Sequence, residues 1–333
     1  MELMEYTEFQ TYLKEEVQKR LGKGFHVFVK EIPKNNGVRL RGLIIHREGC
    51  DVSPTIYLEE FFSLYRTGKT TEKILTELLR LYEEAKRNED FSLDFFTDFE
   101  KVRKKIAFKL IHAEKNKKIL KKIPFMPFLD LAIVFYCKIQ EEPIGNGSIL
   151  LQNEHLLRWG VQTEELYRTA LKNTPLLLPY TLRPMGHILK EFIDVQDDLP
   201  MYVLSNAEGT QGAAAIVYPD VLRDFADLRG EDIYVLPSSV HEVILLSKSS
   251  APEAARLEAM VREVNGTQVC PEEVLSDSVY LFRRDTGRLA IADGTSAGIA
   301  GIDCGTKTCI SGGGMVIGVP AGGHGSKHPD ILR

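Results

Sequence analysis

The chain opens with apolar residues at helical spacing. Four of them stand four positions apart, with charged residues between them: Phe9, Leu13, Val17 and Leu21. In a helix, side chains four positions apart lie on one face. The pattern therefore predicts an amphipathic first helix that packs one face against a core.

Two segments of alternating apolar and polar residues follow, at 26–32 and 38–45, and Asn35-Asn36-Gly37 separates them. Asn-Gly between such segments is a strong hairpin signal, because both residues tolerate the positive φ of a tight turn. The alternation predicts that three apolar side chains face the core: Val38, Leu40 and Ile44. Arg39 and Arg41 then face water.

A strand is predicted at 55–58, then a helix that stops near Gly68 and a second helix that Thr71 can cap. The second helix places five apolar side chains on one face: Ile74, Leu75, Leu78, Leu79 and Tyr82. Charged residues from Glu83 to Asp94 indicate a solvated linker. Residues 1–92 are therefore predicted to be an N-terminal helix-hairpin-helix module.

The order strand, strand, helix then occurs three times within 93–292. In the first unit, strands at 131–138 and 148–151 precede a helix capped near Thr163, and another strand is predicted upstream at 106–111. The second and third units also resemble each other in sequence, because each opens with Tyr-Val-Leu and ends on a helix that begins Pro-acid-x-x-Arg. Their predicted strands are 202–204 with 213–218, and 234–236 with 243–246.

Short turns between consecutive strands require antiparallel pairing, and a helix after each pair can cover only an apolar face of the sheet. The predicted fold class is therefore α+β, with repeated strand-strand-helix units that form antiparallel sheet. A last hairpin at 279–291 turns at Asp285-Thr286-Gly287. The tail, 293–333, has eleven glycines and no aromatic residue, which predicts a disordered segment.

Composition narrows the class of protein. The chain has 333 residues, 44% apolar and 27% charged residues and a net charge of -5, which is typical of a globular protein with an ordinary core. No apolar run approaches the ~20 residues that cross a bilayer, so we expect no membrane association. Five cysteines, three of them isolated, favour a reduced compartment over a disulfide framework. The expected location is the cytoplasm.

Three segments of the chain are distinctive together: Val52-Ser53-Pro54-Thr55-Ile56-Tyr57-Leu58, Phe128-Leu129-Asp130-Leu131-Ala132-Ile133-Val134-Phe135-Tyr136 and Tyr234-Val235-Leu236-Pro237-Ser238-Ser239-Val240-His241-Glu242-Val243. They resemble the uncharacterised bacterial family known as domain of unknown function 5688, and the resemblance extends over about residues 5–291. It implies a bacterial protein but no particular activity. Members of this family tend to stop near the last hairpin, so the tail departs from the family pattern.

The densest group of catalytic residue types is Ser238, Ser239, His241 and Glu242. A nucleophile, a base and a carboxylate are the parts of a hydrolase site, so a hydrolase centred on Ser238 and His241 is one hypothesis. The alternative is a turn followed by a strand, where His241 and Glu242 point to opposite faces. The segment also begins like a zinc-protease motif, but Leu245 stands where that motif has its second histidine.

Between residues 101 and 122, ten basic residues accompany a single acid, Glu114. They are Lys101, Arg103, Lys104, Lys105, Lys109, Lys115, Lys117, Lys118, Lys121 and Lys122. Ten positive charges and one negative charge give a local charge near +9, which can attract polyanions. Nucleic-acid association is therefore a second hypothesis. A solvated face paired with the acidic stretch 83–98 is favoured over it, because no stacking motif accompanies the charge.

Two further motifs match only in part. Cys304, Cys309, His324 and His328 have nearly the spacing of a zinc finger, but the surrounding glycine and proline disfavour the helix that a finger needs. Gly68-Lys69-Thr70 resembles the end of a phosphate-binding loop, yet Ser63 replaces the first glycine of that loop. We predict no cofactor, with zinc in the tail as the alternative.

These observations favour a non-enzymatic interaction or ligand-binding module, because each catalytic motif lacks a residue or a geometry that its chemistry requires. The expected partner is a protein or a small ligand, with nucleic acid as the alternative. The only tryptophan, Trp159, precedes Gly160. It either anchors a partner, as aromatic residues often do, or closes the core beneath a loop.

Overall fold

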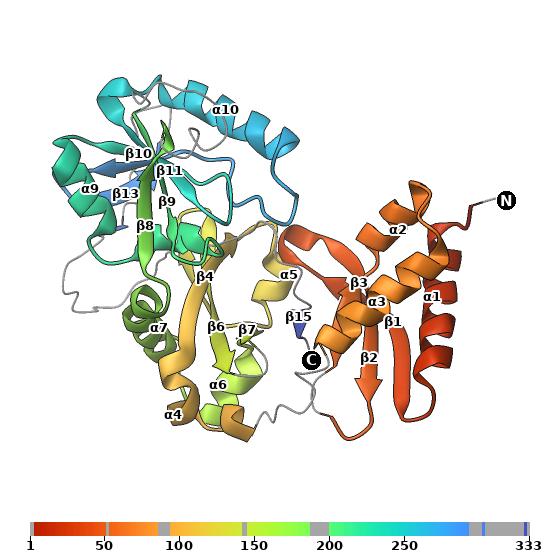
Figure 1. Ribbon diagram of the computed structural model, residues 1–333. Helices are drawn as coiled ribbons and strands as arrows, with labels where there is room; N and C mark the ends of the chain where they lie inside the picture. Colours follow the sequence, from red (N-terminus) through yellow and green to blue (C-terminus); the bar gives the residue numbers. More distant parts are fainter. Residues whose placement is uncertain are drawn as a thin grey trace. The chain divides into compact units, whose positions relative to one another are not determined.

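In the computed structural model the chain has the α+β architecture shown in Figure 1. The structure describes residues 3–50, 53–85, 94–141, 145–186 and 200–292, with two short strands at 302–303 and 330–331. The chain divides into two compact units: one of Met1–Val102, Cys137–Ile149 and Ser326–Arg333, and one of Arg103–Tyr136 and Leu150–Gly325. None of the described helices is long and apolar enough to cross a membrane.

The first unit starts with the predicted amphipathic helix. Its elements in chain order are α1 (Tyr6–Leu21), β1 (Phe25–Pro33), η1 (Asn35–Gly37), β2 (Arg39–Arg47), β3 (Pro54–Tyr57), α2 (Glu59–Arg66), α3 (Thr71–Ala85), η3 (Asp94–Thr97) and α4 (Phe99–Val102). At the start of α1, the backbone N–H of Glu5 donates to the Glu8 carboxylate at 2.9 Å, as in a capping box. Gly22, with φ of 76°, ends the helix. The prediction of α1 is confirmed.

The hairpin is also confirmed, but the prediction of its buried face was wrong. β1 and β2 pair antiparallel over their full length. Leu43 and Ile45 are fully buried, whereas Val38, Leu40 and Ile44 are only half-buried. Side chains alternate between the two faces of a strand, so Leu43 and Ile45 lie on the face that begins with Arg39 and Arg41, and the core covers only the later part of that face. The two arginines predicted to face water are exposed.

Helices α1, α2 and α3 form the core of this unit with the sheet. The cluster of buried side chains includes Phe9, Leu13 and Val17 from α1, Leu43 and Ile45 from β2, and Ile74, Leu75, Leu78 and Tyr82 from α3. Leu79 packs against it while partly exposed. The predicted inner face of α3 is therefore confirmed. Each of these aliphatic or aromatic side chains stabilises the fold by about 1.5–3 kcal/mol when fully buried.

From Arg103 onward the chain adds two further sheets. The elements are η4 (Arg103–Lys105), β4 (Ile106–His112), α5 (Lys117–Leu120), β5 (Phe125–Phe128), β6 (Leu131–Glu141), β7 (Gly145–Leu150), α6 (Asn153–Trp159), α7 (Thr163–Leu177), β8 (Tyr180–Pro184), β9 (Met201–Asn206), η5 (Gly212–Val217), α9 (Val221–Arg229), β10 (Ile233–Leu236), β11 (Val243–Ser247), η6 (Lys248–Ser250), α10 (Ala254–Thr267), β12 (Tyr280–Arg283) and β13 (Arg288–Ile291).

One of these sheets has the order β4-β6-β5 with β7 paired to β6. The other has the order β14-β13-β12-β10-β11-β9-β8, where β14 is Ile302–Asp303. Every strand pair with a described register is antiparallel. Both observations confirm the predicted α+β class. The predicted strands at 106–111, 131–138 and 148–151, the helix from Thr163 and the last hairpin are all present.

The repeated unit is confirmed in its second copy and wrong in its first. The second copy forms β10, β11 and α10, whereas residues 213–218 of the first copy lie in or beside the buried 3-10 turn η5 instead of a strand. The reason is that β9 pairs with β11 on one edge and with β8 on the other. No edge of β9 remains for residues 213–218, so they fold into a compact turn.

The remaining predictions about organisation fall largely outside the described residues. This holds for the module boundary after residue 92 and for nearly all of the tail, 293–333. Only the two-residue strands β14 (Ile302–Asp303) and β15 (Asp330–Ile331) belong to that tail.

Candidate functional site

The segment with the catalytic residue types forms a loop between β10 and β11. Three backbone hydrogen bonds hold this loop against the segment 270–276: Val240 N–H to the Glu273 carbonyl at 2.9 Å, Leu275 N–H to the Ser238 carbonyl at 3.0 Å, and Ser276 N–H to the Pro237 carbonyl at 3.0 Å. Glu242 is half-buried at the end of the loop. These hydrogen bonds fix the backbone of the loop, which leads directly into β11.

The side chains of this loop bond mainly to backbone atoms. The Ser239 hydroxyl accepts the backbone N–H of His241 at 2.9 Å. The buried His241 imidazole has Nδ1 at 3.3 Å from the Gly209 carbonyl and Nε2 at 3.4 Å from the Glu273 carboxylate. A serine nucleophile donates its hydroxyl proton to the histidine ring, whereas the Ser239 hydroxyl meets the backbone of His241. The structure brings Glu273, which was not among the predicted residues, to the His241 ring.

His241 instead joins three segments of the chain. Its carbonyl accepts the Ser205 hydroxyl at 2.9 Å, its ring faces the carbonyl of Gly209, and its Nε2 faces Glu273. Both ring nitrogens face oxygen acceptors, and a neutral imidazole can donate to only one of them. The arrangement is suited to fixing loops against one another.

The described part of the chain contains no group of three or more His, Cys, Asp or Glu side chains arranged to hold a metal ion. The zinc candidates Cys304, Cys309, His324 and His328 lie outside the described residues. Gly68-Lys69-Thr70 connects helix α2 to helix α3, so no strand precedes it, and Lys69 pairs with Glu77. A phosphate-binding loop needs that strand.

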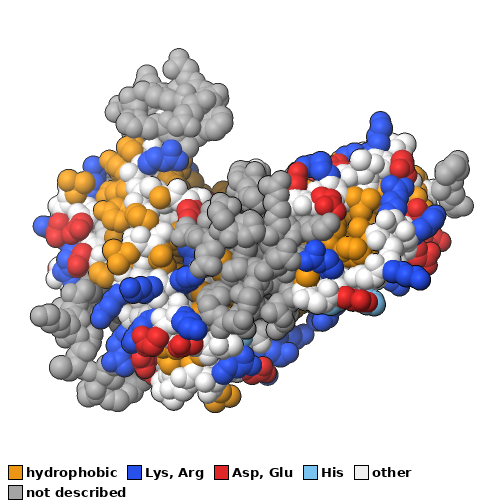
Figure 2. Space-filling model, turned by 60° about the horizontal axis from the view of Figure 1, so that its bottom comes forward, with side chains coloured by type: hydrophobic (Ala, Val, Ile, Leu, Met, Phe, Trp, Pro, Cys, Tyr) orange, Lys and Arg blue, Asp and Glu red, His pale blue; other side chains and the backbone are white. Residues whose placement is uncertain are grey.

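Strand β4 divides the predicted basic segment. Its seven residues span about 23 Å at about 3.3 Å per residue, so the residues before and after it form two groups. The earlier group is Lys101, Arg103, Lys104 and Lys105; the later group is Lys115, Lys117, Lys118, Lys121 and Lys122; Lys109 lies half-buried on the strand. The face drawn in Figure 2 likewise shows basic and acidic side chains interspersed. Within the second unit, β4 therefore separates the basic residues Arg103, Lys104 and Lys105 from the later group.

Trp159 lies half-buried at the end of α6. Its ring centroid is 5.9 Å from that of His155, one turn earlier in the helix. Asn153, the first residue of α6, donates its backbone N–H to the Lys122 carbonyl at 3.0 Å and its side-chain amide to the Lys121 carbonyl at 3.4 Å. Helix α6 therefore begins directly beside the later basic group.

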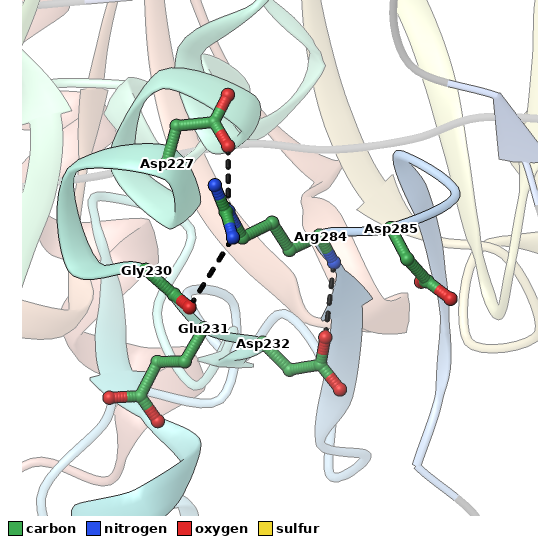
Figure 3. Close-up of a pocket in the computed structure, with 6 residues that line it drawn as sticks. All are labelled: Asp227, Gly230, Glu231, Asp232, Arg284 and Asp285. Carbon is green, nitrogen blue, oxygen red and sulfur yellow. Dashed lines mark hydrogen bonds and ion pairs between the residues drawn. The ribbon is translucent and has the colours of Figure 1, made fainter.

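A polar pocket of about 440 Å³ lies at the C-terminal end of α9 (Figure 3). Six residues from three places in the chain line it: Asp227 and Gly230 at the end of α9, Glu231 and Asp232 before β10, and Arg284 and Asp285 after β12. These places meet because Gly230, with φ of 76°, turns the chain from α9 toward β10, and because β10 pairs with β12.

Arg284 occupies the centre of the pocket (Figure 3). Its Nε donates to Asp227 Oδ1 at 2.7 Å, its Nη1 lies 3.5 Å from the Gly230 carbonyl, and its backbone N–H donates to Asp232 Oδ1 at 3.1 Å. The Asp285 carboxylate accepts the N–H of Thr286 at 2.8 Å. The pocket thus holds one guanidinium group by a carboxylate and a helix-terminal carbonyl.

The charge of this pocket is negative. Four carboxylates and one guanidinium line it, which gives four minus one, or a net charge of -3. Outside the lining, Lys248 pairs with Asp232 at 3.2 Å. The backbone N–H and then the hydroxyl of Ser249 hold the pKa of Glu231 below its ordinary value, with Arg229 contributing less. Carbonyls at the C-terminus of α9 add negative potential.

A second polar cluster, also not predicted, surrounds Asp130 at the turn between β5 and β6. Its Oδ1 accepts the Tyr280 hydroxyl at 2.5 Å, and its Oδ2 accepts the hydroxyls of Ser276 at 2.5 Å and Ser278 at 3.2 Å. Ser276 and Tyr280 are fully buried. Burial first, and then Asp130, raises the pKa of Tyr280, so this hydroxyl remains a donor. The cluster ties the β5–β6 turn to β12.

Comparison with protein families identifies one match. The model of a family of unknown function, DUF5688, matches residues 6–284. The chain belongs to this family. The resemblance seen in the sequence is therefore confirmed over most of the DUF5688 chain. Neither the curated proteins nor the solved structures contain a match to it, so no activity comes from a relative.

Proposed function

We propose that this DUF5688 protein is a non-enzymatic binding protein that holds a small organic cation in the pocket of Figure 3. The observation that carries the proposal is the charge of -3 on the residues that line an open surface pocket of about 440 Å³, a volume within the range of small-ligand sites. An ammonium or guanidinium group on the ligand would bond to carboxylate oxygens beside Arg284. Charge-assisted hydrogen bonds of this kind are stronger than neutral ones.

The contacts around His241 support a non-enzymatic role. A hydrolase serine donates its proton to the histidine base, whereas the Ser239 hydroxyl accepts a backbone N–H from His241. The His241 side chain is 8% exposed as part of a buried loop, which leaves little room for a substrate.

Agmatine, which carries one guanidinium and one ammonium group, tests this proposal in a calorimetric titration. We expect Asp285→Asn to weaken agmatine binding about fivefold or more, because a hydrogen bond to a charged group contributes about 1.5–3 kcal/mol and solvent reduces this value at an exposed site. Asp224→Asn is the matched control. Asp224 is an exposed carboxylate on α9, one turn before Asp227, and it does not line the pocket. Equal losses in both variants, or equal binding of succinate, would overturn the proposal.

The pH dependence of agmatine binding follows from Glu231. Its pKa is lowered, so its negative charge is present above the ordinary carboxyl pKa and is lost only as the pH falls through the lowered value. The contribution of Glu231 to agmatine affinity should therefore remain constant from about pH 7 to about pH 5, because this carboxyl group keeps its charge over that range. Calorimetric titrations at these two values measure it. A marked loss between them would indicate control by a histidine instead.

A further inference from the structure

We propose that a second surface, separate from the cation pocket, binds single-stranded nucleic acid. This basic-aromatic surface consists of Lys118, Lys121 and Lys122 around the end of α5, together with Arg158 and Trp159 on α6. The proposal does not depend on agmatine binding, because none of these residues lines the pocket of Figure 3.

The three lysines supply positive charge that the described carboxylates do not neutralise. Lys118, Lys121 and Lys122 are exposed. In the same stretch Lys115 pairs with Asp277 at 3.7 Å and Lys117 pairs with Glu114, but no described carboxylate lies within ion-pair distance of the other three. Such lysines are available to phosphate groups, whose binding releases counterions and gains affinity from entropy.

The aromatic part of the surface comes from α6. Trp159 and His155 stand four residues apart, so their rings lie on the same face of the helix, with their centroids 5.9 Å apart. Burial, and then the nearby Arg158, lowers the pKa of His155. The imidazole is therefore neutral at pH 7 and presents a flat ring beside the indole. A nucleic-acid base that stacks on such a ring gains about 1–3 kcal/mol.

The spacing between the two parts matches a nucleotide strand. Asn153 is hydrogen-bonded to the carbonyls of Lys121 and Lys122, and six residues separate it from Trp159. At 1.5 Å per residue this rise is about 9 Å, a distance that a few nucleotides of an unpaired strand can span. A strand with its phosphates at the lysines can therefore place a base on Trp159.

The chemistry favours a single strand over a duplex. In a duplex the base faces are stacked on one another and unavailable to an indole, whereas an unpaired strand can splay its bases onto aromatic side chains. Helix α6 has only seven residues, about two turns, and offers no extended groove-reading face. The combination of backbone cations and one aromatic ring is the pattern of sequence-tolerant single-strand binding.

The indole itself reports binding, because Trp159 is the only tryptophan in the chain. We expect an oligouridylate of about 20 nucleotides to quench its fluorescence in the full-length protein, while heparin, which has charge but no bases, leaves the emission unchanged. With three phosphate contacts and a slope of about 0.7 each, affinity should fall about 20-fold between 50 and 200 mM salt. Equal quenching by heparin would overturn the proposal. So would a response to vesicles of anionic phospholipid with none to the oligonucleotide.

Substitutions locate the site. The triple variant Lys118→Ala/Lys121→Ala/Lys122→Ala should lose most of the salt dependence of its affinity for the oligonucleotide. Fluorescence polarisation of a labelled oligonucleotide measures this affinity. The matched control is Lys101→Ala/Lys104→Ala/Lys172→Ala, which removes three exposed lysines elsewhere on the chain. Trp159→Ala should weaken binding about fivefold to hundredfold, from the stacking energy above, and Trp159→Phe should restore part of it. Equal losses in both triple variants, or no difference between Ala and Phe at position 159, would contradict the proposed surface.

Discussion

Gly212→Ala is expected to destabilise the second unit by about 3 kcal/mol, the upper part of the range for overpacking. A Cβ atom at Gly212 would lie 2.1 Å from the Ser205 Oγ and 2.6 Å from both the Asn206 N and the His241 carbonyl oxygen. Two of these three neighbours are backbone atoms, in β9 and in the His241 loop. They cannot move aside without breaking the hydrogen bond from Ser205 to His241.

Urea unfolding followed by Trp159 fluorescence measures this effect, because Trp159 lies in the second unit. Gly266→Ala is the matched control. Gly266 lies in α10, and a Cβ atom there meets nothing within 4 Å, so this substitution should stabilise by up to about 1 kcal/mol through helix propensity. If the Gly212→Ala variant unfolds at the same urea concentration as the unchanged protein, then β9, η5 and the His241 loop are not packed closely around Gly212.

Asp130→Ala should have a comparable effect, about 3–4 kcal/mol. Removal of the carboxylate leaves three hydroxyl groups without their acceptor, from Ser276, Ser278 and Tyr280. A buried donor that loses its partner costs about 1–3 kcal/mol, and the two fully buried donors, Ser276 and Tyr280, make up most of the sum. The same unfolding experiment measures it.

Two milder variants separate the contributions at Asp130. Tyr280→Phe removes one donor and leaves the carboxylate bonded to both serines, so we expect a loss of about 1–2 kcal/mol. Ser278→Ala removes the longer hydrogen bond, 3.2 Å, and should cost less. If Asp130→Ala is no more destabilising than Ser278→Ala, the carboxylate does not hold β12 against the β5–β6 turn.

Local periodicity predicted most of the elements, and pairing between distant strands explains the failures. Helix α3 followed from its apolar spacing, and the β1–β2 hairpin followed from Asn35-Asn36-Gly37. The strand predicted at 213–218 failed because β8 and β11 occupy both edges of β9, which no local pattern reveals. The buried face of β2 was inverted because both of its faces carry apolar residues, so alternation alone did not decide between them.

The pocket depends on three segments that pairing brings together. Its signal in the sequence was an acid at the end of a helix, Asp227, a Gly-acid-acid run, 230–232, and the predicted turn at Asp285. None of these indicates a site by itself. Only the pairing of β10 with β12 places Arg284 beside Asp227. The catalytic residue types near His241 were conspicuous in sequence, and their described contacts are to backbone atoms and to Glu273.

Diffraction from crystals grown with saturating agmatine shows where the cation binds on the protein. We predict density for agmatine in the pocket of Figure 3, with its guanidinium or ammonium group within hydrogen-bonding distance of Asp227 or Asp285. Agmatine bound elsewhere while this pocket stays empty would contradict the account.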